Sequence, residues 1–200
     1  MYTLLNPALV SNHLRDGVTV SFAGKWSDFE DLCAQQSQGR ISFLHNVITI
    51  MSPSFDHEAI AEILGDLVKI YCDSKNLVYY SMGSTTITNK PNAGKQPDAS
   101  FSFQERKEIP DLAIEVIFTS GGLDDLEKYR WLGVTEVWMW KNQELTFYWL
   151  NKQNVYEKRS QSYFLTSVFA SYLVVFANRA LRETPLTIKR DFLARLNDEN

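Results

Sequence analysis

The sequence predicts one α/β domain of the α+β type, in which a mixed, mostly antiparallel sheet is flanked by helices. Its 200 residues suit a single core, and the 44% apolar and 22% charged residues are ordinary for a globular protein. Strand-like runs alternate with helical stretches, the clearest of them at 55–71. No repeat, low-complexity tract or linker divides the chain, so we expect an N-terminal arm (1–25) followed by a single domain (26–200).

The first half of the chain is expected to contain two helices and a hairpin. A short helix follows the arm, with Ser27 as its N-cap. Residues 40–43 and 47–51 have the pattern of a hairpin. The helix at 55–71 has one apolar stripe at helical spacing, formed by Ile60, Ile63, Leu64, Leu67, Val68 and Tyr71.

The second half of the chain mixes further strands with helices. A helix over 123–132 ends at Gly133, since glycine readily adopts the backbone conformation that terminates helices. Helical segments near 165–177 and 185–196 close the chain. Candidate strands, rich in β-branched and aromatic residues, occupy 77–80, 85–88, 97–103, 111–118, 136–140, 145–150 and 155–158.

Charge, cysteines and hydropathy argue against several classes of protein. A net charge of −4 disfavours broad electrostatic capture of nucleic acid, although it is compatible with a local basic surface. Cys33 and Cys72 lie far apart without a CxxC partner, which disfavours a zinc site or a disulfide framework. The N-terminus lacks signal-peptide features, and the longest apolar stretch, 163–177, is too short to span a bilayer. We therefore expect a soluble cytoplasmic protein with no membrane partner.

Glu115 lies where a carboxylate is unfavourable. The segment 111–118 is almost continuously hydrophobic, which is typical of a strand covered on both faces. Burying an unpaired charge there is strongly disfavoured, so Glu115 needs a cation, hydrogen bonds or a shifted pKa.

Asp98 lies near the start of the preceding strand and is expected to face Glu115. A hairpin that is symmetric about Arg106-Lys107 places the two residues directly opposite one another on one face of the sheet. Two carboxylates this close repel by roughly 3–4 kcal/mol at an effective dielectric constant near 20. A shared divalent cation removes the repulsion, and Mg²⁺ commonly takes one or two protein carboxylates together with waters and phosphate oxygens.

A second interpretation of the same residues remains open. Asp98 can cap a turn after Pro97 while Glu115 forms a buried ion pair, and a one-residue slip in register would separate the two carboxylates. Spacing alone does not decide between this arrangement and a metal site.

Several short motifs occur in a fixed order along the chain. They are Met51-Ser52-Pro53-Ser54 followed by His57; Gly83-Ser84-Thr85-Thr86; Pro97-Asp98; Pro110 to Val116; Thr119-Ser120; and Leu132-Gly133-Val134 with Glu136-Val137-Trp138. Each is weak alone, but together, over roughly residues 26–165, they resemble the Uma2 (Uma-two) family of PD-(D/E)XK-type endonucleases.

The resemblance implies a restriction-endonuclease-like core that hydrolyses DNA phosphodiester bonds with Mg²⁺ or Mn²⁺. It matches Asp98 to the metal-binding aspartate and Glu115 to the second acidic ligand, with the carbonyl of Val116 as a further ligand. Nucleases of this superfamily often dimerise, so a homodimer that contacts DNA locally is implied as well. The alternative is a nuclease-fold protein that has lost catalysis and binds nucleic acid or a protein partner.

Two positions depart from the family pattern. Gln96 stands where an acidic residue often precedes the proline, a change that we expect to remove no ligand. The family's lysine, which stabilises or activates the attacking water, corresponds to Asp125 here. Lys128, one turn further along, is the nearest substitute, and we predict that its flexible side chain reaches the catalytic site. The competing interpretation is a surface pair between Lys128 and Asp124.

Other candidates have structural interpretations that we prefer. His57 is expected to cap or pack the first turn of its helix, and Glu58 and Glu62 to lie on a solvated face. The excess of basic residues in the C-terminal segment is expected on the solvated face of an amphipathic helix. Trp138, Trp140, Tyr148 and Trp149 are expected to be core or interface aromatics.

Overall fold

The structure is a computed structural model that describes residues 18–35, 39–118 and 123–198. Within these ranges the strands form two sheets. Sheet A contains, in spatial order, β1 (Thr19–Ala23), β3 (Val47–Met51), β2 (Arg40–Leu44), β6 (Ala93–Lys95) and β5 (Ile87–Asn89). Sheet B contains β11 (Tyr156–Arg159), β10 (Glu144–Leu150), β9 (Glu136–Lys141), β8 (Leu112–Ile117), β7 (Ala99–Phe103) and β4 (Tyr79–Ser81).

The α+β class and the mostly antiparallel pairing are confirmed, but the strands divide between two sheets. Among the described strands, all pairs are antiparallel except β8 with β9, which are parallel. Helix α4 (Leu123–Leu132) lies between these two strands in the sequence, because a parallel pair needs a long crossover connection. This helix also contacts β5 and β6, so it bridges sheet B to sheet A.

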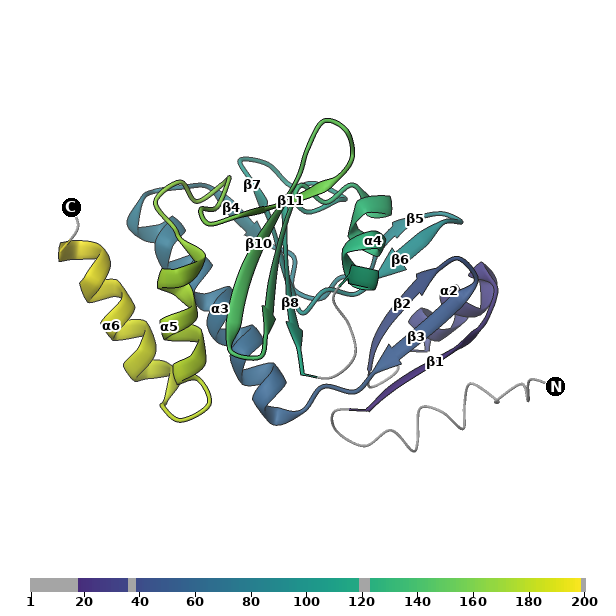
Figure 1. The fold of residues 1–200 in the computed structure, drawn as a ribbon, viewed down its shortest axis with the longest axis horizontal. Coiled ribbons are helices and arrows are strands. Elements are labelled where there is room, and N and C mark those ends of the chain that lie inside the picture. The colour runs from purple at the N-terminus through teal and green to yellow at the C-terminus, as the bar shows by residue number, and fades with distance from the viewer. Residues whose placement is uncertain (1–17, 36–38, 119–122, 199–200) are drawn as a thin grey trace.

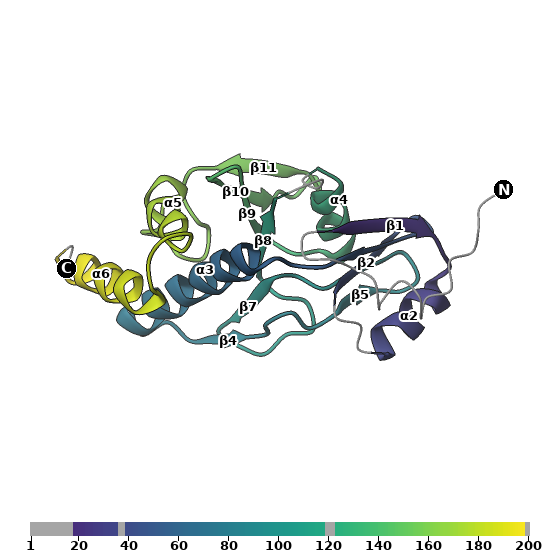
Figure 2. The same ribbon diagram turned by 90° about the horizontal axis from the view of Figure 1, so that it is seen from below.

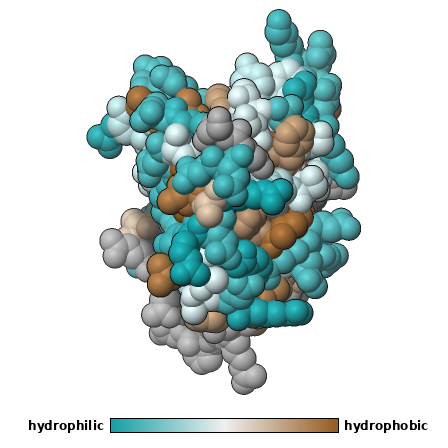
Figure 3. Space-filling view, turned by 90° about the vertical axis from the view of Figure 1, so that its left-hand side faces the viewer, coloured by the Kyte–Doolittle hydropathy of each residue, from teal (hydrophilic) through white to brown (hydrophobic). Residues whose placement is uncertain are grey.

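The helices cover the sheets in two groups, at opposite ends of the molecule. Helix α3 (Phe55–Ser74) and α5 (Ala170–Arg179) pack on sheet B, and α6 (Pro185–Asp198) packs against these two helices, whereas α2 (Trp26–Ala34) packs on sheet A (Figures 1 and 2). The end formed by α5 and α6 presents hydrophilic side chains with apolar ones scattered among them (Figure 3). No helix of the described residues is both long enough and apolar enough to cross a membrane.

The largest core lies between sheet B and α3, α5 and α6. The apolar stripe predicted for the helix at 55–71 is buried there, including Ile60, Leu64 and Leu67. The stripe forms because side chains three and four residues apart share one face of a helix. Helix α3 begins at Phe55 as predicted, and Ser54 caps it by accepting a hydrogen bond of 3.2 Å from the backbone N–H of His57.

Several local predictions are corrected by the structure. Helix α2 begins at Trp26 with Lys25 at its N-cap, so Ser27 lies inside the helix rather than capping it. Residues 19–23, expected in an irregular arm, form β1 and pair with β3. Residues 1–17 and the Thr119-Ser120 motif lie outside the described residues.

Strand β6 was not predicted, and its sequence explains why. Ala-Gly-Lys has neither alternation nor β-branched residues, so its strand conformation depends on pairing with β2 and β5 on either side. Gly94 is required by packing, because a Cβ atom at this position would lie 2.4 Å from the ring of Phe29. The strand matters for function because it ends at Lys95.

Candidate active site

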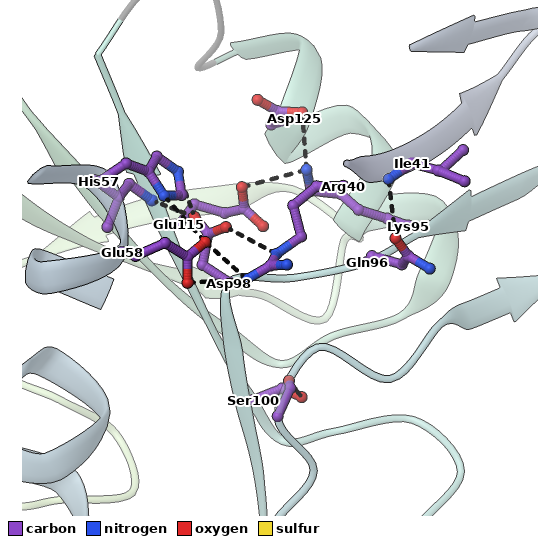
Figure 4. Close-up of polar contacts among 12 residues, drawn as sticks. Arg40, Ile41, His57, Glu58, Lys95, Gln96, Asp98, Ser100, Glu115 and Asp125 are labelled. Atoms are coloured by element: carbon purple, nitrogen blue, oxygen red, sulfur yellow. Dashed lines mark hydrogen bonds and ion pairs between the residues drawn. The ribbon is translucent and has the colours of Figure 1, made fainter. Parts of the chain in front are cut away.

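Strands β7 and β8 pair in the predicted register. Ala99 lies opposite Ile114 and Phe101 opposite Leu112, and just beyond these pairs the N–H of Asp98 donates to the carbonyl of Ile114, the residue before Glu115, at 3.2 Å. The side chains of Asp98 and Glu115 therefore enter one buried polar cluster (Figure 4).

One oxygen of the Asp98 carboxylate accepts a hydrogen bond from the described part of the chain, and the other does not. Its side chain is 1% exposed. Oδ2 accepts the backbone N–H of Val116 at 2.8 Å and lies 3.2 Å from His57 Nε2. Oδ1 has no hydrogen-bond partner among the described residues, and Arg40 Nε lies 3.5 Å from it. A buried carboxylate oxygen normally has a partner, so Oδ1 retains lone pairs for a cation.

His57 has a larger role than the capping and packing that we expected. Burial lowers the pKa of its imidazole, but the adjacent Asp98 carboxylate outweighs burial, so the net shift is upward. The imidazole of His57 therefore lies beside Asp98, with Nε2 3.2 Å from Oδ2, in addition to the backbone contact of His57 with Ser54.

Glu115 forms a buried ion pair, as the second interpretation of the sequence foresaw. Its Oε2 lies 3.2 Å from Lys95 Nζ, and its Oε1 accepts a hydrogen bond from the hydroxyl of Tyr129. Burial raises the pKa of Glu115 to about 7; Lys95 opposes this shift, while Asp98 and Asp125 add to it. The negative charge of Asp98 thus acts on the Glu115 carboxylate, and Lys95 offsets this repulsion only in part.

Lys95 is the functional candidate that sequence reasoning missed. Its Nζ lies 3.2 Å from Asp125 Oδ1, in addition to its contact with Glu115, and the residue is 6% exposed. Burial lowers the pKa of Lys95, but the charges of Asp125 and Glu115 raise it by more than burial lowers it. The net shift is upward, so the ammonium stays protonated. The signal in the sequence was a lysine three residues before Asp98, but its partners become visible only when β6 pairs with β2.

Lys128 contacts Asp125 rather than Asp124. Its Nζ lies 3.1 Å from Asp125 Oδ1, and the side chain is buried rather than on the surface. Burial and the neighbouring Lys95 lower the pKa of Lys128. Asp125 therefore bridges Lys95 and Lys128. Burial raises the pKa of Asp125, but the two ammonium groups lower it by more, so the net shift is downward. The cation in contact with Glu115 comes from sheet A and not from α4.

A cleft of about 170 Å³ lies between the two sheets above these groups. Sheet A forms one wall, and α3, β8 and α4 form the other. Arg40, which also pairs with Glu58 at 3.0 Å, lies on the wall from sheet A. Gln96 ties the same region together by accepting the N–H of Ile41 and donating to Thr86, so it has a structural role.

The donor groups present suit a hard cation. The described residues contain no group of three or more His, Cys, Asp and Glu side chains arranged to hold a metal ion, so the four-ligand site typical of structural zinc is absent there. Mg²⁺ and Mn²⁺ take carboxylate, carbonyl and water oxygens and need few protein ligands. The Oδ1 of Asp98, which accepts no hydrogen bond from the described residues and lies beside Glu115, fits such an ion.

Comparison with known proteins places the chain in a family. A sequence model of the family Uma2, described as "Putative restriction endonuclease", matches residues 26–172. The chain belongs to the Uma2 family. No curated protein matches it.

The nuclease-type fold of the family is also found in a solved structure. The crystal structure of a protein from Anabaena variabilis ATCC 29413, described as a "putative nuclease belonging to DUF820", superposes with a TM-score of 0.56 at 13% sequence identity. The match covers 76% of this chain and 98% of that one. At this identity the likeness concerns the fold alone. In this Uma2 member Lys95 lies between two carboxylates, with its Nζ 3.2 Å from both Glu115 Oε2 and Asp125 Oδ1.

Proposed function

We propose that this protein is a metal-dependent endonuclease that hydrolyses DNA phosphodiester bonds. Asp98, Glu115 and the backbone carbonyl of Val116 would hold Mg²⁺ or Mn²⁺, which when bound supplies a Lewis acid and lowers the pKa of a coordinated water. The observation that carries this proposal is the buried Asp98 carboxylate, one oxygen of which accepts no hydrogen bond within the described ranges and has only the ion pair with Arg40 there, close to Glu115 and beside a cleft.

The surrounding side chains supply the order and charge that phosphoryl chemistry needs. Val116 N–H and His57 fix one oxygen of Asp98, so the other keeps a set direction. Positioned positive charge accounts for much of the catalysis of phosphoryl transfer, because negative charge spreads over the phosphoryl oxygens in the transition state. Arg40 on the wall of the cleft is placed to contact such oxygens.

Lys95 is our first candidate for the family's lysine, and Lys128 remains a second. Lys95 Nζ already lies 3.2 Å from a proposed metal ligand, whereas Lys128 reaches the site through Asp125. In the role we assign it, Lys95 donates to the attacking water or to a phosphoryl oxygen while Asp125 holds its side chain. Lys128 keeps its predicted catalytic role only if its removal lowers cleavage as much as removal of Lys95.

The test is cleavage of supercoiled plasmid DNA in Mg²⁺, in Mn²⁺ and in excess chelator. We expect nicking only with metal, and its loss by orders of magnitude in Glu115→Ala and Asp98→Ala. Glu62→Ala is the matched control, because Glu62 is an exposed carboxylate on α3 outside the cleft. Cleavage that persists in chelator, or equally in all variants, would overturn the proposal.

The alternative function is binding without catalysis, and one observation favours it. Lys95 and Arg40 already lie 3.2 Å and 3.5 Å from the two carboxylates, so they balance these charges without a metal. Under this alternative no metal produces cleavage, and DNA affinity is unchanged by chelator. We also propose, on the resemblance alone, that the protein is a homodimer in the cytoplasm, and light scattering after size exclusion measures the oligomeric state.

A further inference from the structure

A row of hydroxyl side chains crosses sheet A and ends at Lys95. The register places Ser21 opposite Thr49, Thr49 opposite Ser42, and Ser42 opposite Lys95. We call Ser21, Thr49 and Ser42 the hydroxyl row. Residues paired across neighbouring strands lie on the same face of a sheet, so the row and Lys95 share one face.

That face is the wall of the cleft. The opposite face of sheet A is apolar and packs under α2 through Ile41, Phe43, Ile48 and Ile50. All three residues of the hydroxyl row line the cleft, as does Lys95. Their burial increases along the row, since Ser21 is exposed, Thr49 is half-buried, and Ser42 and Lys95 are 5% and 6% exposed. The row therefore descends from solvent towards the carboxylates.

The chemistry of the row suits the backbone of a polynucleotide. Hydroxyl groups donate hydrogen bonds to phosphate and sugar oxygens without reading the base sequence. Strands lie about 4.8 Å apart, so the row spans roughly 14 Å from Ser21 to Lys95, longer than a single phosphate group needs. Ser21 and Thr49 currently bond each other at 2.9 Å, and either hydroxyl can rotate to a ligand.

The other wall presents an exposed aromatic ring. Phe118 follows β8, lines the cleft and is 43% exposed. Trp140 supports the ring, with centroids 5.1 Å apart, and His57 lies at 6.4 Å. An exposed ring held by a buried aromatic is a stacking platform, and bases of unpaired strands stack on such rings with little sequence preference.

We propose that the cleft binds a single unpaired DNA strand, with its backbone along the hydroxyl row and one base stacked on Phe118. This deepens the proposed nuclease function and rests on it for the identity of the ligand. Bases inside a duplex are covered on both faces by their neighbours, so Phe118 can stack only on a base that has left the helix. The carboxylates also lie deep, with side chains 1% and 6% exposed, where a narrow single strand reaches more easily than a duplex.

Binding of fluorescein-labelled DNA, followed by anisotropy in chelator and in Ca²⁺, tests the proposal. The probes are a single strand of about 12 nucleotides and the duplex of the same sequence. We expect the wild-type protein to bind the single strand more tightly. Phe118→Ala should weaken this binding about 5- to 100-fold, and Phe118→Trp should retain it. Ser42→Ala should weaken it about 2- to 10-fold.

Two control variants match these changes. Tyr163 is also an exposed ring, 51% accessible and stacked on Trp149 at 5.8 Å, but it lies outside the cleft, so Tyr163→Ala should bind normally. Ser27→Ala removes an exposed hydroxyl from α2 and should likewise have no effect.

The outcomes separate this proposal from the nuclease function. Tighter binding of the duplex, or unchanged affinity in Phe118→Ala, overturns the single-strand proposal even if the plasmid is cleaved. Preferred binding of the single strand that depends on Phe118 supports it, even if no metal produces cleavage and the nuclease function fails.

Discussion

Replacing Lys95 by Met should destabilise the protein strongly. Methionine has nearly the shape of lysine, so the change removes charge with little change in volume. Lys95 Nζ lies 3.2 Å from both Glu115 and Asp125 in a buried site. After the substitution Asp125 still has Lys128, but among the residues that the structure describes Glu115 retains only the hydroxyl of Tyr129.

The size of the effect follows from these distances. At 3.2 Å and an effective dielectric constant near 20, each ion pair attracts by about 5 kcal/mol before desolvation is subtracted. Breaking a buried pair by removing one partner costs about 3–5 kcal/mol, because the remaining charge is uncompensated. We therefore expect Lys95→Met to lower the unfolding free energy by about 3–5 kcal/mol and the Tm by roughly 6–20 °C.

A double-mutant cycle with Glu115→Gln isolates the cause, measured by urea unfolding at about pH 8. Glutamine retains the size of glutamate and removes its charge. Lys95→Met/Glu115→Gln should be more stable than Lys95→Met by about 2 kcal/mol or more, because no uncompensated charge remains at position 115. If Lys95→Met costs less than about 1 kcal/mol, or if the second change restores nothing, then the reasoning from a buried pair is wrong.

Three further predictions concern the same cluster. The pKa of Glu115 is raised to about 7, so the folded state binds more protons than the unfolded state between about pH 4.5 and 7. The unfolding free energy should fall as pH rises through this window, and urea titrations should show a smaller fall in Glu115→Gln. Millimolar Mn²⁺ should raise the Tm of the wild type. The rise should be larger at about pH 8 than at pH 6, because at pH 6 the metal must displace the proton of Glu115. An equal rise in Asp98→Ala/Glu115→Ala would show that the metal binds elsewhere. Asp125→Lys should lower the Tm and should not raise the rate of cleavage. The Nζ atoms of Lys95 and Lys128 lie 3.2 Å and 3.1 Å from the Asp125 carboxylate, so the substitution places a third ammonium group beside them.

The sequence alone determined the local features of the site. The register of β7 and β8 followed from a short symmetric hairpin, and side chains alternate with a period of two, so opposing Asp98 and Glu115 required no knowledge of other elements. The start of α3 followed from helical spacing and the end of α4 from the glycine after Leu132, whereas α3 continues to Ser74, beyond the predicted end at Tyr71. The ordered motifs predicted the family, and the match to the family model confirmed that prediction.

Only the tertiary structure decided what surrounds the two carboxylates. Lys95 and Arg40 reach them from sheet A because β6 pairs with β2, a contact between residues about fifty positions apart. Nothing in Ala-Gly-Lys signals that pairing, and an ion pair leaves no periodicity in a sequence. The carboxylates were therefore predictable from the alternation of one hairpin, whereas their cationic partners depend on how two sheets pack together.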